Sequence, residues 1–339
     1  MLYFAPLLVY ITECKPHNMK RLVLLLLSVL GTHLCASAQL TELQQIQKLN
    51  LVYQQIRNNY VDDVSLKPLV EEAIRATLKE LDPHSQYLTK EEMTETRERL
   101  REPDAITSSQ RSGDIGYIAV SRFSKPLAAE FYKAYRVLGD IESLVVDLRD
   151  NGGGAITSAI DLTSLFLHKG DVIVSTEGRN TNAIYDTKHD GKLCDIPVIV
   201  LINENSASAS EIFAGAIQDH DRGVVVGRTS FGKGLVQRLI NLKDGSGVTI
   251  TVARYKTPSG RVIQRPYQMG RSDDYQRDTM RYQHPDSIRH DDAPIFKTLK
   301  LGREVYGGGG ITPDIYIESD TIALTKDAID RWLEVISPR

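Results

Sequence analysis

The feature of this sequence that most constrains its fold is a regular alternation of apolar strands and amphipathic helices from residue 115 onward. "IGYIAVSRF" is typical of a strand and "PLAAEFYKAYRVLG" of a helix, and the alternation continues through "SLVVDLRD", "ITSAIDLTSLFL", "DVIVSTEG", "PVIVLINEN", "SASEIFAGAIQDH" and "GVVVG". Such alternation favours helices layered against a sheet. We therefore expect an α/β fold whose core is a mixed sheet with helices.

The segments on either side of this alternation differ in character. Before it, residues 41–60, 66–81 and "KEEMTETRERLRE" predict three helices, and residues 102–114 have a linker's composition. After it, "LVQRLINL", "GVTITVARYKT" and "GRVIQRPY" predict strands, residues 268–292 are charged and irregular, and "GGGGITPDIYI" predicts a turn with a last strand. "ALTKDAIDRWLEVI" predicts a closing helix. We expect an N-terminal helical subdomain at 39–105 and a main domain at 106–339.

The first 38 residues predict an export signal. A basic pair after Met19 precedes the apolar run 22–30, and "ASA" at 36–38 supplies small residues for cleavage. The run is shorter than the ~20 residues that span a bilayer, which argues against the alternative of a membrane anchor. We expect cleavage after Ala38, translation from Met19 rather than Met1, and an exported protein in the periplasm.

Composition excludes several classes of partner. A formal net charge of −3 gives no reason to expect nucleic acid. Cys194 is the only cysteine after residue 38, so we expect neither a disulfide nor a cysteine-based zinc site. The eight histidines show no metal-ligand spacing. The sequence predicts no metal and no cofactor.

The stretch "GRTSFGKG" at 227–234 is one residue short of a phosphate-binding loop. Such a loop needs Ser or Thr after the lysine and a helix to follow. Here Gly234 follows Lys233, and "LVQRLINL" predicts a strand. We expect no nucleotide binding.

Ser208 falls between a buried strand and a helix, as in a nucleophile elbow. An oxyanion formed there could accept the Ala209 amide, and the glycine turn after another strand offers the amides of Gly153 and Gly152. The alternative is a capping box formed by Ser208 with Glu211, which the local sequence alone favours. Taken singly, the lysine is also more typical of a solvated loop charge, and "NGGG" of an ordinary turn.

Seven motifs in order resemble those of the carboxy-terminal processing (tail-specific) serine peptidases. They lie between Leu43 and Ile317 and read "LDPHSQYLTKEEM", "IGYIAVSRF", "LVVDLRDNGGG", "SASASEIFAGAIQD", "VVVGRTSFGKGLVQ", "TVARYKTPSGRVIQ" and "GGGGITPDI". The resemblance implies a crotonase-like core with a helical cap, Ser208 as nucleophile, Lys233 as general base 25 residues later, and Gln237 as a third member. The family's PDZ domain has no room between residues 101 and 114.

A lysine acts as a base at neutral pH only if its pKa falls about three units. Desolvation can lower the pKa, and Phe231, Leu235 and Val236 are apolar neighbours of Lys233 in sequence. The four residues on each side of it include no carboxylate that would oppose this shift. Gln237 lies two strand steps beyond Lys233, so its side chain should point the same way and can orient the amine without adding charge.

Three other interpretations remain open. A Ser-His-Asp triad with Asp219 and His220 is disfavoured, because eleven helical residues separate Asp219 from Ser208 by ~16 Å. A non-catalytic peptide-binding module and acyl-CoA chemistry suit the same fold, but give no reason for the Ser–Lys pair. If the chain is a peptidase, we expect flexible polypeptide substrates, and an adaptor replacing the PDZ domain or a homo-oligomer as partners.

Overall fold

The computed structural model describes residues 41–101, 104–271, 275 and 293–317. The predicted signal peptide, most of the charged segment 268–292 and the predicted closing helix lie outside these residues. The chain divides into two compact units, Met1–Glu72 and Ala73–Arg339. This division comes earlier in the chain than the expected boundary after residue 105. Across the described residues, no helix is long and apolar enough to cross a membrane.

The first unit contains helical residues, as the sequence predicted. Residues 41–59 form one helix, and α3 (Leu66–Lys79) begins in this unit and crosses into the second. The hydroxyl of Tyr53 donates to the carbonyl of Leu69, so the two helices contact each other within the unit.

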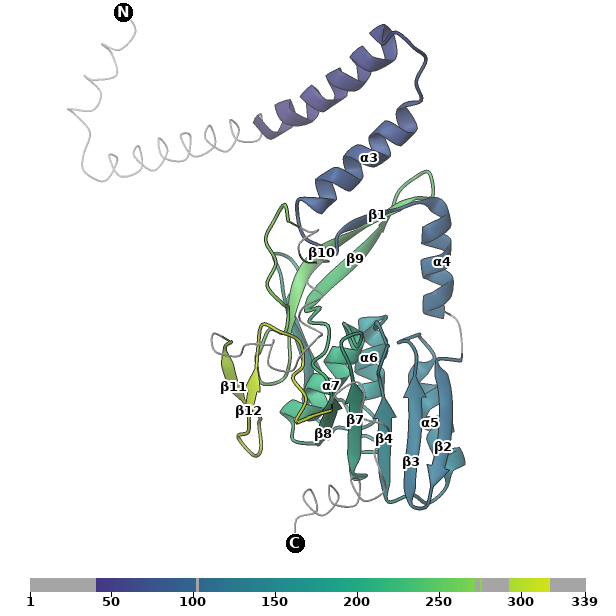
Figure 1. Cartoon of the computed structure of the whole chain (residues 1–339), viewed down its shortest axis with the longest axis vertical. Coiled ribbons are helices and arrows are strands. Elements are labelled where there is room, and N and C mark those ends of the chain that lie inside the picture. Colours follow the sequence, from purple (N-terminus) through teal and green to yellow (C-terminus); the bar gives the residue numbers. More distant parts are fainter. Residues whose placement is uncertain (1–40, 102–103, 272–274, 276–292, 318–339) are drawn as a thin grey trace, which may run out of the picture. The chain divides into compact units, whose positions relative to one another are not determined.

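The second unit is built on a six-stranded sheet in the order β13-β8-β7-β4-β3-β2 (Figure 1). All neighbouring pairs are parallel except β2 with β3. The strands are β2 (Ile106–Ser112), β3 (Ile115–Val120), β4 (Ser143–Asp147), β7 (Val198–Ile202), β8 (Gly223–Gly227) and β13 (Ile315–Tyr316). Every residue of β4 and β7 is buried, which explains their continuous apolar sequences. This sheet and its helices confirm the α/β prediction.

Three helices pack into the main hydrophobic core against this sheet: α5 (Leu127–Leu138), α6 (Ile156–Thr163) and α7 (Ala209–Asp219). Within this core, Phe166 packs edge-on to both Phe131 and Phe213, with ring centroids 5.7 and 5.3 Å away. All eleven residues of α7 are buried. Since this helix starts after Ser208, the core fixes the position of that serine.

A second, five-stranded sheet brings the N-terminal motifs to the main domain. Its order is β1-β10-β5-β6, and β9 pairs with β10; β1, β9 and β10 are labelled in Figure 1. The strands are β1 (Gln86–Leu88), β5 (Val172–Glu177), β6 (Ala183–Asp186), β9 (Leu235–Asn241) and β10 (Gly247–Lys256), all in antiparallel pairs. The polar helix α4 (Lys90–Arg101) follows β1, and a hairpin of β11 (Ile295–Lys297) with β12 (Glu304–Tyr306) completes the described elements. Residues 86–88 therefore lie beside β10, which also pairs with β9, the strand that follows Lys233.

Two predictions about local structure were wrong. Residues 106–112, expected as a linker, form β2, because antiparallel pairing with β3 stabilises a polar edge strand that has little intrinsic signal. "GRVIQRPY" makes only the isolated bridge between Lys256 and Val262 instead of a strand. There Arg261 is fully buried and its guanidinium bonds α7 and β12. This side chain, together with scattered backbone hydrogen bonds to residues 262 and 263, anchors the segment in place of a strand ladder.

The buried ion pair of Arg261 with Asp219 yields the first prediction. Both side chains are 0% exposed and lie 2.6 Å apart. Removing one partner leaves an uncompensated buried charge, so Asp219→Ala should lower the free energy of unfolding by about 3–5 kcal/mol. Urea denaturation measures this, and Asp186→Ala, in an exposed pair with Lys188, should leave the midpoint unchanged. A loss below about 1 kcal/mol would show that Arg261 is not dependent on this partner.

Candidate active site

Ser208 lies at a sharp turn between β7 and α7. Its φ is 56° and its ψ is −110°, a conformation that costs a non-glycine residue about 1–3 kcal/mol. Strained strand-to-helix turns of this kind present the side chain of a nucleophile elbow. The expected capping box with Glu211 is also present, so the turn is both a helix cap and an elbow.

The carboxylate of Glu211 joins the serine turn to the lysine loop. Its Oε2 accepts the amides of Ser208 (2.8 Å) and Lys233 (2.9 Å). Its Oε1 accepts the Gly232 amide (2.6 Å) and the Ser230 hydroxyl. Glu211 is fully buried, and burial raises the pKa of its carboxyl group while the four hydrogen bonds oppose that rise. The sequence predicted the cap, but not that the same side chain holds residues 230–233.

Tyr255, on β10, connects the same two residues through their carbonyls. Its hydroxyl lies 2.5 Å from the carbonyl oxygen of Lys233 and 3.2 Å from that of Ser208. The side chain is 1% exposed, so it has no water to donate to. Ser208 and Lys233 are thus held together at their amides by Glu211 and at their carbonyls by Tyr255. Sequence reasoning missed Tyr255, because nothing near it in sequence indicates this contact.

The amine of Lys233 contacts the predicted third residue. Lys233 Nζ donates to Gln237 Oε1 at 3.0 Å, whereas no hydrogen bond joins this amine to the Ser208 hydroxyl among the described residues. Catalytic hydrogen bonds often form only in the substrate complex, so this geometry does not exclude the pair. Gln237 Nε2 in turn donates to the main-chain carbonyl of His84. The amide side chain is fixed at both ends.

The turn at residues 82–85 is itself held by a buried carboxylate. Asp82 accepts the amides of His84 (2.9 Å) and Ser85 (2.8 Å) and the Ser85 hydroxyl (2.6 Å). The "LDPHS" motif therefore shapes a turn whose carbonyl fixes Gln237. The sequence indicated this motif by resemblance, but gave no role for Asp82 or His84.

Burial lowers the pKa of Lys233, as the sequence predicted, but the charges around it differ from expectation. Glu211 and Asp82 raise this pKa, while Arg99 lowers it. The sequence neighbours of Lys233 include no carboxylate, but the fold brings Glu211 and Asp82 close enough to affect its pKa. Desolvation remains the largest cause, so the neutral amine is still favoured relative to a free lysine.

The imidazole ring of His84 is neutral and lies close enough to the Lys233 amine to feel its charge. Burial lowers the pKa of its imidazole to about 4, and the positive charge of Lys233 contributes to the shift. His84 Nε2 lies 3.2 Å from the Tyr275 hydroxyl, and its ring packs edge-on to Tyr275. The guanidinium of Arg265 lies over the rings of Phe231 and Tyr275. In this arrangement, protonation of the His84 imidazole is unfavourable at neutral pH.

The glycine turn lies against the serine turn, as expected for an oxyanion site. A Cβ on Gly153 would fall 2.9 Å from the Ala209 nitrogen and 2.6 Å from the Ala207 oxygen, so only glycine allows this approach. However, the Gly153 amide already donates to Asn151 Oδ1 at 2.9 Å. The Gly153 amide is therefore engaged in this conformation, and its donation to an oxyanion stays a prediction. The amides of Ala209 and Gly152 make no hydrogen bond to a described residue.

The remaining sequence-derived candidates lie elsewhere. Asp219 binds Arg261, and His220 Nε2 lies 2.7 Å from the Val172 carbonyl oxygen, so both are engaged at the far end of α7 from Ser208. "LVQRLIN" forms strand β9, so the helix that a phosphate-binding loop requires is replaced by a strand. Neither the triad nor the phosphate loop is supported.

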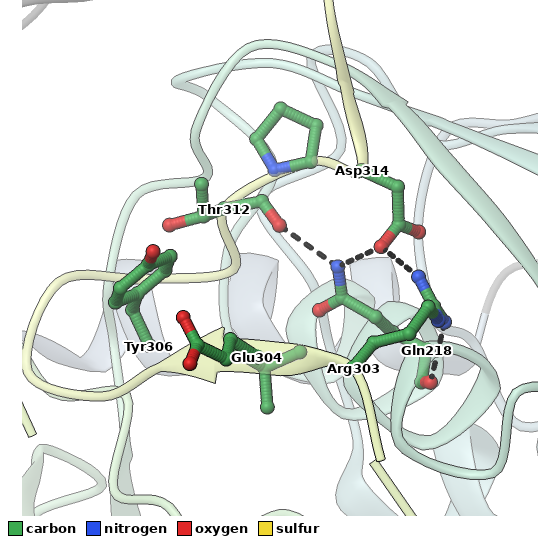
Figure 2. A pocket seen from close by; sticks show the side chains of 8 residues that line it. Gln218, Arg303, Glu304, Tyr306, Thr312 and Asp314 are labelled. Atoms are coloured by element: carbon green, nitrogen blue, oxygen red, sulfur yellow. Dashed lines mark hydrogen bonds and ion pairs between the residues drawn. The ribbon is translucent and has the colours of Figure 1, made fainter. Parts of the chain in front are cut away.

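A surface pocket also lies at the far end of α7 (Figure 2). The Gln218 amide donates to the Thr312 carbonyl (2.9 Å) and to Asp314 (3.0 Å), while Arg303 binds Asp314 and the Gln218 carbonyl. Figure 2 shows these labelled groups directed toward one another. Because they satisfy each other, we do not assign this pocket to substrate.

Comparison with known proteins agrees with the fold and the motifs. Residues 114–275 match the model of peptidase family S41, and residues 29–92 match the N-terminal domain of the activating protease CtpB. A carboxy-terminal-processing protease of Bartonella bacilliformis is 44% identical over 162 residues, covering 45% of this chain and 37% of that protein. A probable CtpA-like serine protease of Staphylococcus aureus is 34% identical over 212 residues, covering 58% and 42%.

The solved structure of a lipoprotein from Streptococcus agalactiae shares the fold, with a TM-score of 0.50, 17% identity, and coverage of 86% of this chain and 89% of that one. The chain spans between about a third and two fifths of the length of the curated relatives named above. The motifs around Ser208 and Lys233 fall inside the matched region. Residues 114–275 of this chain belong to peptidase family S41.

Proposed function

We propose that the chain is a serine endopeptidase that cleaves flexible polypeptides through an acyl-enzyme on Ser208, with Lys233 as general base. The observation that carries this proposal is the double connection of these two residues by Glu211 and Tyr255, next to an amine whose pKa burial lowers. Family membership supports hydrolysis of peptide bonds.

The proposed reaction needs one base and two amide donors. The neutral Lys233 amine takes the Ser208 hydroxyl proton as the oxygen attacks the peptide carbonyl carbon. The Ala209 amide and the Gly152 amide stabilise the negative oxygen of the tetrahedral intermediate. The lysine then gives the proton to the departing amine as the C–N bond breaks. Water, deprotonated by the same amine, releases the acyl group and returns the serine hydroxyl.

The proposed substrates are unfolded or flexible chains that pair with strand edges of the core by backbone hydrogen bonds. The connection from α4 to β3, residues 102–114, includes strand β2 and two residues outside the described ranges, and it is too short to hold a PDZ domain. Without one, we expect weak discrimination of the substrate's C-terminal residues, unless an adaptor supplies it. Export to the periplasm belongs to this proposal and rests on the signal-like residues 19–38.

Substitution of the proposed catalytic pair gives the most direct test. Ser208→Ala and Lys233→Ala should each lower casein hydrolysis about 10³-fold or more, with the fold intact by circular dichroism. Lys233→Arg should be equally inactive, because a guanidinium does not deprotonate at these pH values. Lys243→Arg, in the exposed turn after β9, is the matched control with parent activity.

Fluorophosphonate labelling of Ser208 provides the second readout in the same variants. Labelling should require both Ser208 and Lys233. An active Lys233→Arg protein would overturn the Ser–Lys mechanism, whereas an inert parent protein would favour a non-catalytic peptide-binding module.

The pH profile of kcat/KM should identify the base. The reacting amine must be neutral, so activity should fall as pH decreases through the lowered pKa of Lys233. The pKa of His84 is about 4, so its ring is neutral on both sides of pH 6.5 and contributes no change there. His84→Gln should therefore retain the acid limb of the profile at the parent position. Loss of the limb in this variant would assign the ionisation to His84 instead.

A double-mutant cycle should test whether the 82–85 turn acts through Gln237. Gln237→Ala should lower kcat about tenfold, less than Lys233→Ala, because it removes orientation but not the base. Asp82→Ala removes three hydrogen bonds that shape the turn and should act through the same contact. The double variant should then be no slower than the slower single variant. Fully additive losses in ΔG‡ would mean that the two side chains act independently.

A further inference from the structure

His168, Cys194 and Asp195 bring three different metal-ligand types together on the surface of the second unit. One ligand atom from each lies within 4.8 Å of the other two. Cys194 Sγ and Asp195 Oδ2 are 3.7 Å apart. From metal–sulfur and metal–oxygen bonds of about 2.3 and 2.0 Å, a tetrahedral zinc ion places such ligands about 3.5 Å apart. The cysteine and aspartate are thus already near the separation that an ion requires.

The two chain segments that carry these ligands are fixed to each other by their backbones. The Gly191 amide donates to the Leu167 carbonyl (2.9 Å), and the Leu193 amide donates to the Leu165 carbonyl (2.7 Å). A Cβ on Gly191 would lie 2.3 Å from the Leu165 oxygen, so glycine is needed for this approach. Residues 165–168 and 191–195 therefore form one scaffold, which lowers the conformational entropy lost on binding an ion.

Arg222 stabilises this scaffold through hydrogen bonds to both of its segments. Its guanidinium donates to the carbonyls of Phe166 (2.8 Å), Leu193 (2.6 Å) and Ile196 (2.5 Å). One partly buried side chain thus ties the segment before His168 to the residues on both sides of Cys194. The Cys194 side chain is only partly covered, so an ion can reach its sulfur atom from solvent.

The imidazole of His168 can move to complete the coordination of a bound ion. The His168 side chain is 48% exposed, so its imidazole is free to rotate. A movement of ~1 Å would bring a ring nitrogen from a separation of up to 4.8 Å to the distance between two ligands of one bound ion. Asp190 Oδ1 lies 3.5 Å from His168 Nδ1 and also accepts the Lys169 amide (2.9 Å). A carboxylate next to a ligating imidazole orients the ring and raises its basicity.

We propose that His168, Cys194 and Asp195 bind one zinc-class divalent cation, which crosslinks residues 165–168 to residues 191–195. A thiolate, an imidazole and a carboxylate suit zinc or cobalt rather than calcium or magnesium. The expectation of no metal considered linear spacing alone, which cannot show that residues 26 positions apart converge. Arg222 lies just beyond the C-terminal end of α7, whereas Ser208 lies at its start, so the cation stabilises the fold and takes no part in proteolysis.

Cobalt binding to the full chain tests the site. Every sample carries Cys14→Ser and Cys35→Ser, so that Cys194 is the only thiol. Titration of the chelator-treated protein with Co²⁺ should give a thiolate-to-cobalt charge-transfer band that saturates at one ion per chain and is lost when Zn²⁺ is added. Cys194→Ser should abolish the band, and His168→Ala and Asp195→Asn should each weaken binding at least tenfold. His189→Ala, an exposed histidine on the same loop, should bind as the parent does.

Thermal unfolding and proteolysis complete the test. Zn²⁺ should raise the Tm of the parent but not that of Cys194→Ser, and proteolysis below the transition should be the same with and without chelator. No band at saturating Co²⁺, or a band unchanged in His168→Ala and Asp195→Asn, would overturn the site. Because these readouts are independent of Ser208, a failed metal site and a failed peptidase assignment give different results.

Discussion

The candidate active site depends on the hydrogen bonds that the fully buried carboxylate of Glu211 accepts. A buried carboxylate is costly unless its oxygens accept hydrogen bonds, and here four donors from two segments satisfy them. The serine turn and the lysine loop must therefore both be in place before the carboxylate is stable. This requirement compensates for the strained backbone of Ser208 and brings the two residues together.

The lysine environment reflects a balance of opposing effects. Burial lowers the pKa of Lys233, while Glu211 and Asp82, which build the site, raise it. These two carboxylates thus hold the active-site residues in place, but they also disfavour the neutral form of the Lys233 amine. Hydrogen bonds from amides and hydroxyls offset part of their charge, and the neutral ring of His84 adds none. Desolvation remains the larger effect, which is consistent with a lysine base.

Helix α7 connects the active site to the stability of the domain. Its first residue follows Ser208, and its last, Asp219, binds Arg261 in the interior. Arg222, just after the helix, holds the scaffold on which the proposed cation site lies. The helix is buried all round, so its small and apolar residues pack on every side. Substitutions at either end of α7 should therefore affect the packing of the same hydrophobic core.

The sequence by itself determined the α/β alternation, the strand–turn–helix position of Ser208 and the candidate Ser–Lys–Gln set. The first two follow from local periodicity, and the Ser–Lys–Gln set follows from the resemblance of short motifs to those of a known peptidase family. The polar strand β2 was missed because only its pairing with β3 makes it a strand. The roles of Tyr255 and the 82–85 turn, the carboxylates near Lys233, the engaged Gly153 amide and the convergence of His168 with Cys194 were decided by the tertiary structure. Each joins residues far apart in sequence or depends on side-chain orientation, and linear spacing encodes neither.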